Sequence, residues 1–279
     1  MNGVNKTLYI PLYGKAYVSR KGIILEDKKA EEIWDKEQFE LKGKSKSKWL
    51  AYYMGMRSAV FDEWVKSHLT YSKKMDNMIE DDESGKNKEC IVLHIGCGMD
   101  SRACRVGSSA GHWYDVDFPD VIEERRKYYR ENDTYHMLSA DARETDWISS
   151  LPKTRAIIVL EGISMYFKAE EMQRLLKGLT EHFTEVNVLM DCYTKKAAKA
   201  SKYKNPINDV GVTVVYGIDD PHVFEENTGL EYVCEHNMTP DHMITQLVGF
   251  EKAIFKPVFG GKISKAMYRM YEYRSNTSK

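Results

Sequence analysis

Residues 90–102 read CIVLHIGCGMDSR, and the expected fold is built outward from this stretch. Cys90–Ile95 is a short apolar run, which is typical of a strand buried on both faces of a parallel sheet. The run stops at Gly96-Cys97-Gly98, where glycine lets the backbone turn sharply and approach a ligand with no Cβ in the way. A Gly-x-Gly pair alone is a weak indicator, because most such pairs are ordinary turns.

Four further apolar runs are each followed by, or end in, an acidic residue. The runs are His112–Asp117 with Asp117, Tyr135–Ala140 with Asp141, Ala156–Leu160 with Glu161, and Val186–Met190 with Asp191. Asp117 comes 19 residues after Gly98, which is the position of a ribose-binding carboxylate in nucleotide-binding α/β folds. Ligands of open α/β sheets bind outside the carboxyl ends of the strands. The sequence therefore predicts an α/β fold with a nucleotide site surrounded by carboxylates.

The charge of these residues favours one cofactor over another. A dinucleotide brings a pyrophosphate, which a group of carboxylates repels, whereas S-adenosylmethionine brings a ribose diol, an adenine amino group, an ammonium and a sulfonium. Ser101 also stands where the dinucleotide motif Gly-x-Gly-x-x-Gly has its third glycine. We therefore expect a methyltransferase. The alternatives are an NAD-dependent oxidoreductase on the same kind of sheet and a non-catalytic protein that keeps the fold.

Composition excludes several other classes. The 279 residues are 42% hydrophobic and 30% charged, with a net charge of −1, so neither nucleic acid nor an anionic membrane is expected as a partner. An odd count of five cysteines without a C-x-x-C pair indicates reduced thiols and a cytoplasmic protein. No run has the length of a membrane span or the pattern of a signal peptide. The eight histidines include no H-x-x-x-H pair, and we expect no metal.

Residues 1–88 are expected to form a helical extension with a flexible connector at 72–89, ahead of a core at 89–279. Lys15 lies in an aromatic segment that is either a surface arm or a lid over the cofactor. A helix of about twenty residues from Ser47 to His68 is predicted from an apolar stripe at spacings of three and four. Arg57 lies beside that stripe, where it either extends to solvent or holds the cofactor's carboxylate with little role in stability.

The C-terminal third is less informative. Residues 194–220 are expected to be an insertion that shapes the acceptor pocket, Gly229–His236 a late strand and Thr239–Glu251 a helix. Periodicity does not decide whether the tail after Met267 is helix or strand.

Taken together, several segments resemble the leucine carboxyl methyltransferase family, and within it the bacterial branch related to polyketide O-methyltransferases of the tetracenomycin type. The resemblance rests on IPLYGKA near the N-terminus, the helix with Arg57, HIGCGMDSR, WYDVDFP, DAR followed by Trp147, and LEGISMYF. It covers roughly residues 8–193. It implies a Rossmann-like fold with a mostly parallel seven-stranded sheet and helices on both faces.

The same resemblance implies where the cofactor is bound. Lys15 and Arg57 match the positions that hold the methionine carboxylate. Gly96 and Gly98 match the loop beneath the methionine and ribose. Asp117 matches the acid that accepts from the ribose hydroxyls.

Further positions carry over to the adenine and the acceptor. Asp141 with Ala142 matches the adenine contact, although leucine is frequent in the family where Ala142 stands, and a helix-capping role for Asp141 stays open. Glu161 matches the acid beside the cofactor. Tyr166 matches an aromatic that faces the acceptor, and with Arg57 it is the candidate catalytic residue.

The family implies methyl transfer from S-adenosylmethionine to an oxygen, with S-adenosylhomocysteine as product. A carboxylate acceptor is already ionised at neutral pH, so it needs no general base, whereas a phenol favours one. We therefore expect a small-molecule, polyketide-like carboxylate as the acceptor. A protein C-terminus is the less favoured carboxylate.

Overall fold

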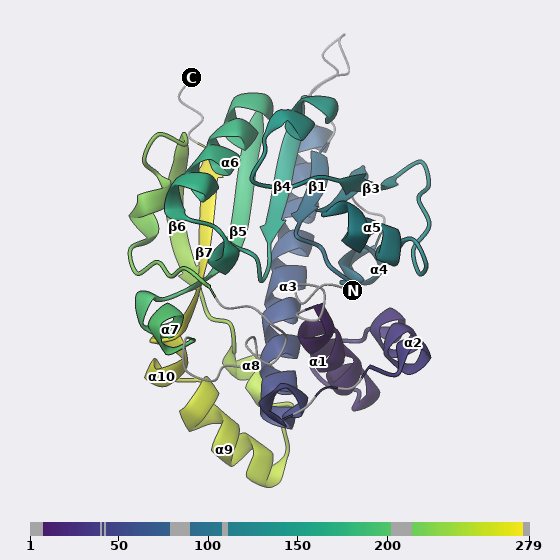
Figure 1. The fold of residues 1–279 in the computed structure, drawn as a ribbon, viewed down its shortest axis with the longest axis vertical. Coiled ribbons are helices and arrows are strands. Elements are labelled where there is room, and N and C mark those ends of the chain that lie inside the picture. The colour runs from purple at the N-terminus through teal and green to yellow at the C-terminus, as the bar shows by residue number, and fades with distance from the viewer. Residues whose placement is uncertain are drawn as a thin grey trace.

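The computed structural model describes residues 8–39, 41, 43–78, 90–107, 111–201 and 214–275. Its centre is one seven-stranded sheet with the order β3-β2-β1-β4-β5-β7-β6 (Figure 1). The strands are β1 (Cys90–Ile95), β2 (His112–Asp117), β3 (Tyr135–Ser139), β4 (Arg155–Leu160), β5 (Glu185–Tyr193), β6 (Leu230–His236) and β7 (Tyr268–Ser275). β1 to β5 pair in parallel, and β7 runs antiparallel between β5 and β6. The predicted mostly parallel α/β sheet is confirmed.

Helices cover both faces of this sheet (Figure 1). They are α1 (Tyr9–Arg20), α2 (Lys28–Glu37), α3 (Lys48–Met78), α4 (Arg102–Val106), α5 (Pro119–Arg125), α6 (Ala169–His182), α7 (Lys195–Ala200), α8 (Asp241–Ile244), α9 (Gly249–Phe259) and α10 (Lys262–Lys265). Short 3-10 turns are η2 (Gly43–Lys46), η3 (Asp146–Ser150), η4 (Ser164–Tyr166) and η6 (Pro221–Phe224). Among the described helices, none combines the length and apolar character needed to cross a bilayer.

The central strand β1 is buried on both faces, as its apolar run predicts. Val92 packs in one core with α3, while Ile91 and Leu93 pack in a second core with α6. Successive side chains of a strand point to opposite faces, so one strand supplies both cores. The carboxyl end of β1, with the glycine loop, is thereby held rigidly at the edge of the sheet.

The helix that contains Arg57 is longer than predicted. α3 has 31 residues and continues to Met78, whereas the sequence predicted an end near His68 and a connector over 72–89. Residues 72–78 (SKKMDNM) are largely polar but contain neither glycine nor proline, so polarity alone does not end the helix. The rest of the predicted connector, 79–89, lies outside the described residues.

Two glycines bring α1 close to α3. A Cβ at Gly14 would lie 2.7 Å from the Cβ of Met54, and one at Gly55 would lie 2.8 Å from a methyl group of Val18. Real Cβ contacts are longer, so only glycine allows this approach. The close packing places Lys15 of α1 beside the edge of the sheet where the strands end.

The periodicity of the sequence does not decide the structure of the tail after Met267, and the structure does. The tail forms β7, and β5 extends past Asp191 because Tyr193 pairs with Tyr268. The sequence predicts Asp191 at the end of its strand, and in the structure it lies inside β5, two residues before the end at Tyr193. The predicted helix Thr239–Glu251 is two helices, α8 and α9, separated by an extended Val248, and α9 begins at Gly249, which has a positive φ.

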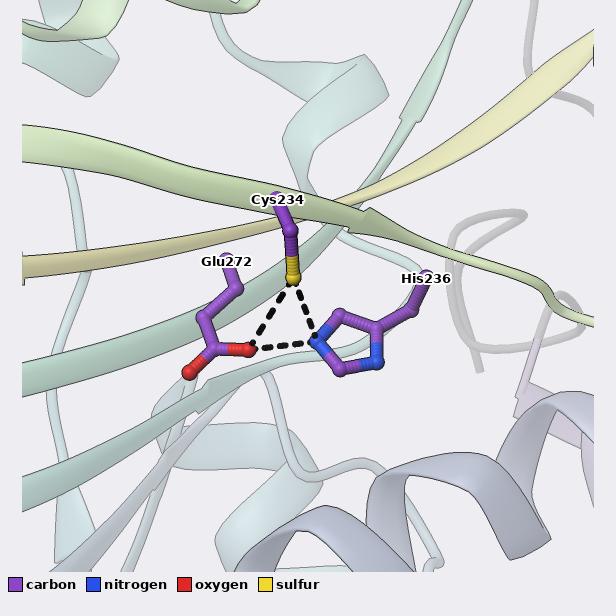
Figure 2. Close-up of side chains that lie close together, drawn as sticks. All are labelled: Cys234, His236 and Glu272. Atoms are coloured by element: carbon purple, nitrogen blue, oxygen red, sulfur yellow. Dashed lines mark hydrogen bonds and ion pairs between the residues drawn. The ribbon is translucent and has the colours of Figure 1, made fainter.

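Strand pairing at the far edge of the sheet joins β6 to β7. Cys234 lies directly opposite Glu272, after an irregularity in the register between Tyr232 and Cys234. His236 follows two residues later, and the three side chains meet on one face (Figure 2). In the predicted insertion 194–220, α7 and residues 214–220 are described, and residues 202–213 lie outside the described part.

Candidate active site

A cavity of about 560 Å³ opens where the parallel strands end. All nine site residues that the sequence predicts line it. They are Lys15, Arg57, Gly96, Gly98, Asp117, Asp141, Ala142, Glu161 and Tyr166. Its size falls within the range of about 300–1,000 Å³ that holds small ligands. A larger hollow of about 1050 Å³ contains none of the nine, so the chemistry is concentrated in the smaller cavity.

The glycine loop that follows β1 forms the floor of this cavity. Gly96 has a φ of 71°, in the left-handed region that side chains disfavour. A Cβ at Gly96 would lie 2.0 Å from the side chain of Ile163, so glycine is required twice over. Within the loop the thiol of Cys97 is buried, and burial raises its pKa well above its usual range. Cys97 is therefore a space-filling residue in this loop.

Asp117 ends β2 beside the glycine loop. One carboxylate oxygen accepts from the backbone N–H of Gly98 at 2.7 Å, and the other accepts from the N–H of Phe118 at 2.8 Å. Burial raises the pKa of this carboxyl, and the two N–H groups partly oppose the rise. Each oxygen keeps a further lone pair, so the carboxylate is fixed in place with acceptors to spare for a diol.

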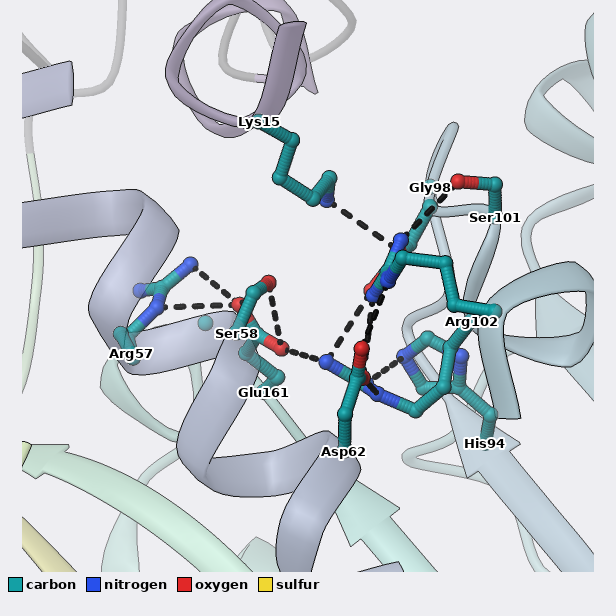
Figure 3. Close-up of polar contacts among 12 residues, drawn as sticks. Lys15, Arg57, Ser58, Asp62, His94, Gly98, Ser101, Arg102 and Glu161 are labelled. Atoms are coloured by element: carbon teal, nitrogen blue, oxygen red, sulfur yellow. Dashed lines mark hydrogen bonds and ion pairs between the residues drawn. The ribbon is translucent and has the colours of Figure 1, made fainter. Parts of the chain in front are cut away.

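Behind the cavity lies one connected network of buried ion pairs (Figure 3). Among the described residues it contains four cations, Lys15, Arg57, Arg102 and Arg105, and five carboxylates, Asp27, Asp62, Asp100, Glu161 and Asp191. With all groups ionised, the carboxylates outnumber the cations by one. A ligand with a net positive charge therefore balances this site better than an anionic one.

Arg57 reaches from α3 into the centre of this network. Its Nε and Nη2 lie 3.0 and 2.9 Å from Glu161, and its Nη1 lies 3.1 Å from Asp191. Nη1 also donates to the hydroxyl of Tyr268 at 3.0 Å. The side chain is 5% exposed, so Arg57 does not extend to solvent. Arg57 is held between Glu161, which follows β4, and Asp191 of β5, so it connects these strands to α3. It also lines the cavity.

The two acids beside Arg57 differ in their protonation equilibria. Burial alone would raise the pKa of Glu161, but Arg102 and Arg57 outweigh it and lower the value to about 2. Burial raises the pKa of Asp191 to about 6, because Arg57 opposes it only in part. Glu161 is thus ionised at neutral pH, whereas Asp191 titrates close to it.

Asp191 should make the stability of the protein depend on pH. Its folded-state pKa of about 6 lies above the ordinary 3.8, so the folded state binds more protons between these values and stability falls as pH rises through them. Raising the pKa of Asp191 from 3.8 to about 6 changes the free energy of unfolding by about 3 kcal/mol over the full titration. Urea unfolding at pH 4.5–7.5 should show Asp191→Asn gaining on the wild type by about 2 kcal/mol as pH rises, because about 1 kcal/mol of the total effect falls below pH 4.5.

The matched control for that series is Asp133→Asn, at an exposed position. Its difference from the wild type should stay constant across the same pH range. Parallel curves for the wild type and Asp191→Asn would show that Asp191 does not titrate in this window.

Lys15 enters the cavity from α1. Its Nζ lies 3.2 Å from Asp100, and the side chain is 3% exposed. An ammonium group has three donors, so Lys15 keeps donors for a second acceptor inside the cavity. Asp100, which belongs to the GCGMDSR stretch, is the anchor for this lysine.

The adenine-side residues Asp141 and Ala142 are only partly buried. Asp141 accepts from the backbone N–H of Arg143 at 3.0 Å and from its guanidinium at 2.6 Å. The backbone bond closes a local turn and caps no helix, because the next 3-10 segment, η3, begins at Asp146 with Thr145 as its N-cap; the predicted capping alternative for Asp141 is therefore wrong. The ion pair is partly solvated and therefore weak, so an incoming amino group can displace Arg143. Ala142 lines the cavity beside it.

Aromatic side chains line the opposite part of the cavity. Tyr166 of η4, Tyr193 at the end of β5 and Tyr268 at the start of β7 all contribute. Tyr268 donates to Asp191 at 2.8 Å while it accepts from Arg57. Sequence reasoning did not assign a role to Tyr268, since no local pattern links it to Arg57 across 211 residues.

Comparison with known proteins agrees with this geometry. The family model of leucine carboxyl methyltransferase matches residues 10–180. The chain is 27% identical over 256 residues to the tetracenomycin polyketide synthesis O-methyltransferase TcmP of Streptomyces glaucescens, covering 90% of this chain and 89% of that protein. It is 28% identical over 157 residues to the S-adenosyl-L-methionine-dependent methyltransferase dpfgK of Gibberella zeae, covering 50% of this chain and 53% of that protein.

The solved structure of a putative methyltransferase from Thermobifida fusca shares the fold. It superposes with a TM-score of 0.51 at 15% identity, over 84% of this chain and 90% of that one.

The fold and these matches define an S-adenosylmethionine-dependent methyltransferase, with S-adenosylhomocysteine as product. The chain belongs to the leucine carboxyl methyltransferase family. This membership decides between the expected methyltransferase and the NAD-dependent oxidoreductase.

The residues that line the cavity fit this cofactor. Lys15 and Arg57 offer cationic donors, Asp117 offers two fixed acceptors, and the network carries one more carboxylate than cations. S-adenosylmethionine has a carboxylate, a diol, and a net positive charge from its ammonium and sulfonium. Each group thus has a counterpart of the required chemistry in the cavity.

Proposed function

We propose that the protein methylates a carboxylate oxygen of a small, largely apolar acceptor. One observation carries this proposal: Glu161, the carboxylate that lines the cavity directly after β4, accepts from Arg57 and Ser58 and pairs with Arg102. Its pKa is lowered to about 2, although burial acts in the opposite direction. Such a group is a poor general base, and a carboxylate acceptor needs none.

The roles proposed for the chain's own residues follow from their contacts. Lys15 and Arg57 bind the methionine carboxylate, and the loop from Gly96 to Gly98 lies beneath the methionine and ribose. Asp117 accepts from the ribose hydroxyls.

The remaining roles concern the adenine and the transfer. Asp141 and Ala142 bind the adenine, Glu161 lies beside the cofactor, and Tyr166 orients the acceptor. The bound cofactor supplies an electrophilic methyl group, and the protein supplies alignment and exclusion of water, which can contribute about 7–11 kcal/mol.

The cavity lining supports an apolar acceptor closed off from water. Leu8, Ile10, Pro11 and Leu12, in and before α1, contribute to the lining together with Lys15. We propose that residues 1–88 act as an extension whose first helix is a lid over the core at 89–279. A polyketide-like aromatic acid suits these apolar and aromatic surfaces.

The five cysteines are free, which supports placement in the cytoplasm.

A phenol is the competing acceptor, and one observation favours it. The Tyr268 hydroxyl lines the cavity and donates to Asp191, whose pKa burial raises to about 6. That pair provides a route by which a proton from a phenol reaches a base. A protein C-terminal carboxylate is the other competitor.

A hydroxynaphthoic acid, which carries both groups on one ring, separates these acceptors. With S-adenosylmethionine, we expect the alkali-labile methyl ester as product and not the alkali-stable ether. With a naphthoic acid, kcat/KM should be nearly constant from pH 6.5 to 9, because the acceptor stays ionised. Product mass before and after mild alkali, and initial rates across this range, are the measurements.

The matching naphthol and a short peptide ending in a leucine carboxylate are the comparison acceptors. If only the ether forms, at a rate that rises with pH, the acceptor is a phenol and the proposed carboxylate acceptor is wrong. Turnover of the peptide alone would identify a protein C-terminus. Binding of S-adenosylhomocysteine, measured by isothermal titration, confirms in each case that the cofactor site is intact.

A further inference from the structure

Three potential metal ligands meet at the edge of the sheet, away from the active-site cavity. They are Cys234 and His236 of β6 and Glu272 of β7 (Figure 2). The Sγ of Cys234 lies 3.5 Å from the Nε2 of His236 and 3.6 Å from the Oε2 of Glu272. Within the described part of the chain, this group brings together a thiol, an imidazole and a carboxylate whose ligand atoms all lie within 4.8 Å of one another.

The strand register explains why these side chains converge. Residues two apart on a strand point to the same face, so Cys234 and His236 share a face of β6. Glu272 lies directly opposite Cys234 on β7, at the separation where cross-strand side chains interact. Three backbone positions in paired strands therefore fix the ligand set, without any flexible loop.

The separations match those of a tetrahedral zinc site. Zinc bonds of about 2.0–2.3 Å at tetrahedral angles place ligand atoms about 3.3–3.6 Å apart. Both distances from the Cys234 sulfur have this length. The Nε2 of His236 and the Oε2 of Glu272 are 2.5 Å apart and would have to separate by about 0.8 Å to accept the ion.

The surroundings of Glu272 hold its carboxylate in position. Its second oxygen, Oε1, lies 3.4 Å from the Nε2 of His68 on α3, and the Nδ1 of His68 lies 3.0 Å from the carbonyl oxygen of Trp64. Ligating carboxylates commonly have such an outer partner. Burial alone would raise the pKa of Glu272, but the hydrogen bonds with His236 and His68 lower it well below its usual range. The carboxylate is ionised at neutral pH, as a ligand must be.

We propose that Cys234, His236 and Glu272 bind one divalent cation of the zinc class, with a solvent molecule completing four-coordination. The donor set of sulfur, nitrogen and oxygen is one that zinc accepts, whereas magnesium and calcium take oxygen ligands. The His236 side chain is 27% exposed, which leaves an entry path for the ion. Binding breaks the Cys234 S–H bond, forms a sulfur–metal bond and releases the thiol proton to water, while the proton that His236 Nε2 donates to Glu272 moves to Nδ1 so that Nε2 can bind the ion.

The site is separate from methyl transfer. None of the three residues lines the active-site cavity, and the ion would instead join the edge strand β6 to β7, whose Glu272 contacts His68 of α3. An edge strand depends on few partners, so a cross-strand ligand set stabilises it. The sequence predicts no metal, because its histidines lack ligand spacing along the chain, whereas this ligand set is assembled by pairing between β6 and β7.

Cobalt titration of the metal-free, reduced full-length protein tests the proposal. Binding should give a thiolate-to-cobalt charge-transfer absorption that saturates at one equivalent and is abolished by zinc. Cys234→Ser should remove this absorption and weaken zinc binding by at least about 10- to 100-fold, the loss seen even for outer partners of a metal site. Glu272→Gln, which keeps the shape of the side chain, should weaken zinc binding by a similar factor.

The matched control is Cys104→Ser, since Cys104 is an exposed thiol outside the group. It should keep both the absorption and the zinc affinity. Circular dichroism and unchanged affinity for S-adenosylhomocysteine show that each variant is folded. The proposal is overturned if the wild type gives no charge-transfer absorption, or if the absorption persists in Cys234→Ser.

Discussion

Arg57→Ala should lower the free energy of unfolding by about 3–5 kcal/mol, because removing one partner leaves buried carboxylates without compensation. Arg57 is 4% exposed and contacts Glu161, Asp191 and Tyr268. The variant should also bind S-adenosylhomocysteine at least about tenfold more weakly, since a charge-assisted hydrogen bond contributes about 1.5–3 kcal/mol. Urea unfolding and isothermal titration measure the two effects.

This outcome differs from the expectation drawn from the sequence, which assigned Arg57 little role in stability. Arg20→Ala is the matched control, because Arg20 pairs with Asp35 at the surface and such pairs contribute about 0–1 kcal/mol. Arg57→Lys keeps the charge with fewer donors and should fall between Arg57→Ala and the wild type in both measurements. If Arg57→Ala were as stable as the wild type, the ion pairs of Arg57 would not stabilise the fold. If Arg57→Lys and Arg57→Ala both bound S-adenosylhomocysteine as tightly as the wild type, Arg57 would not contact the cofactor.

Asp117→Asn should weaken S-adenosylmethionine binding by about 10- to 150-fold while the protein stays folded. The carboxylate accepts from the N–H groups of Gly98 and Phe118, and it lines the cavity with acceptor capacity left on each oxygen. An amide presents a donor where one of these acceptors was, so it loses both the charge and one acceptor. A loss of about 1.5–3 kcal/mol per charged hydrogen-bonding partner gives the expected factor.

Asp133→Asn, at an exposed position, is the control for a generic change of surface charge. Titration with both S-adenosylmethionine and S-adenosylhomocysteine should give the same factor for Asp117→Asn, because the ribose is common to both. Equal affinities of the variant and the wild type would remove Asp117 from the cofactor site.

Much of the sheet could be predicted from local sequence. The strands from β1 to β5 were located to within a few residues, because apolar runs and glycines report on burial and backbone conformation over short distances. The glycine loop and Asp117 were predicted as neighbours, and the N–H of Gly98 donates to Asp117 at 2.7 Å. Prediction was poorer for the end of α3, since polar composition resembles a loop even where no residue breaks the helix.

The sequence by itself determined the α/β class, the glycine loop and the acids at the ends of β2 to β4, because each depends on residues close together in the chain. Only the tertiary structure decided which buried charges are paired, as with Arg57, Asp191 and Tyr268. It alone brought Cys234 beside Glu272. Those contacts depend on strand order and register between distant segments, and register follows from how whole elements pack.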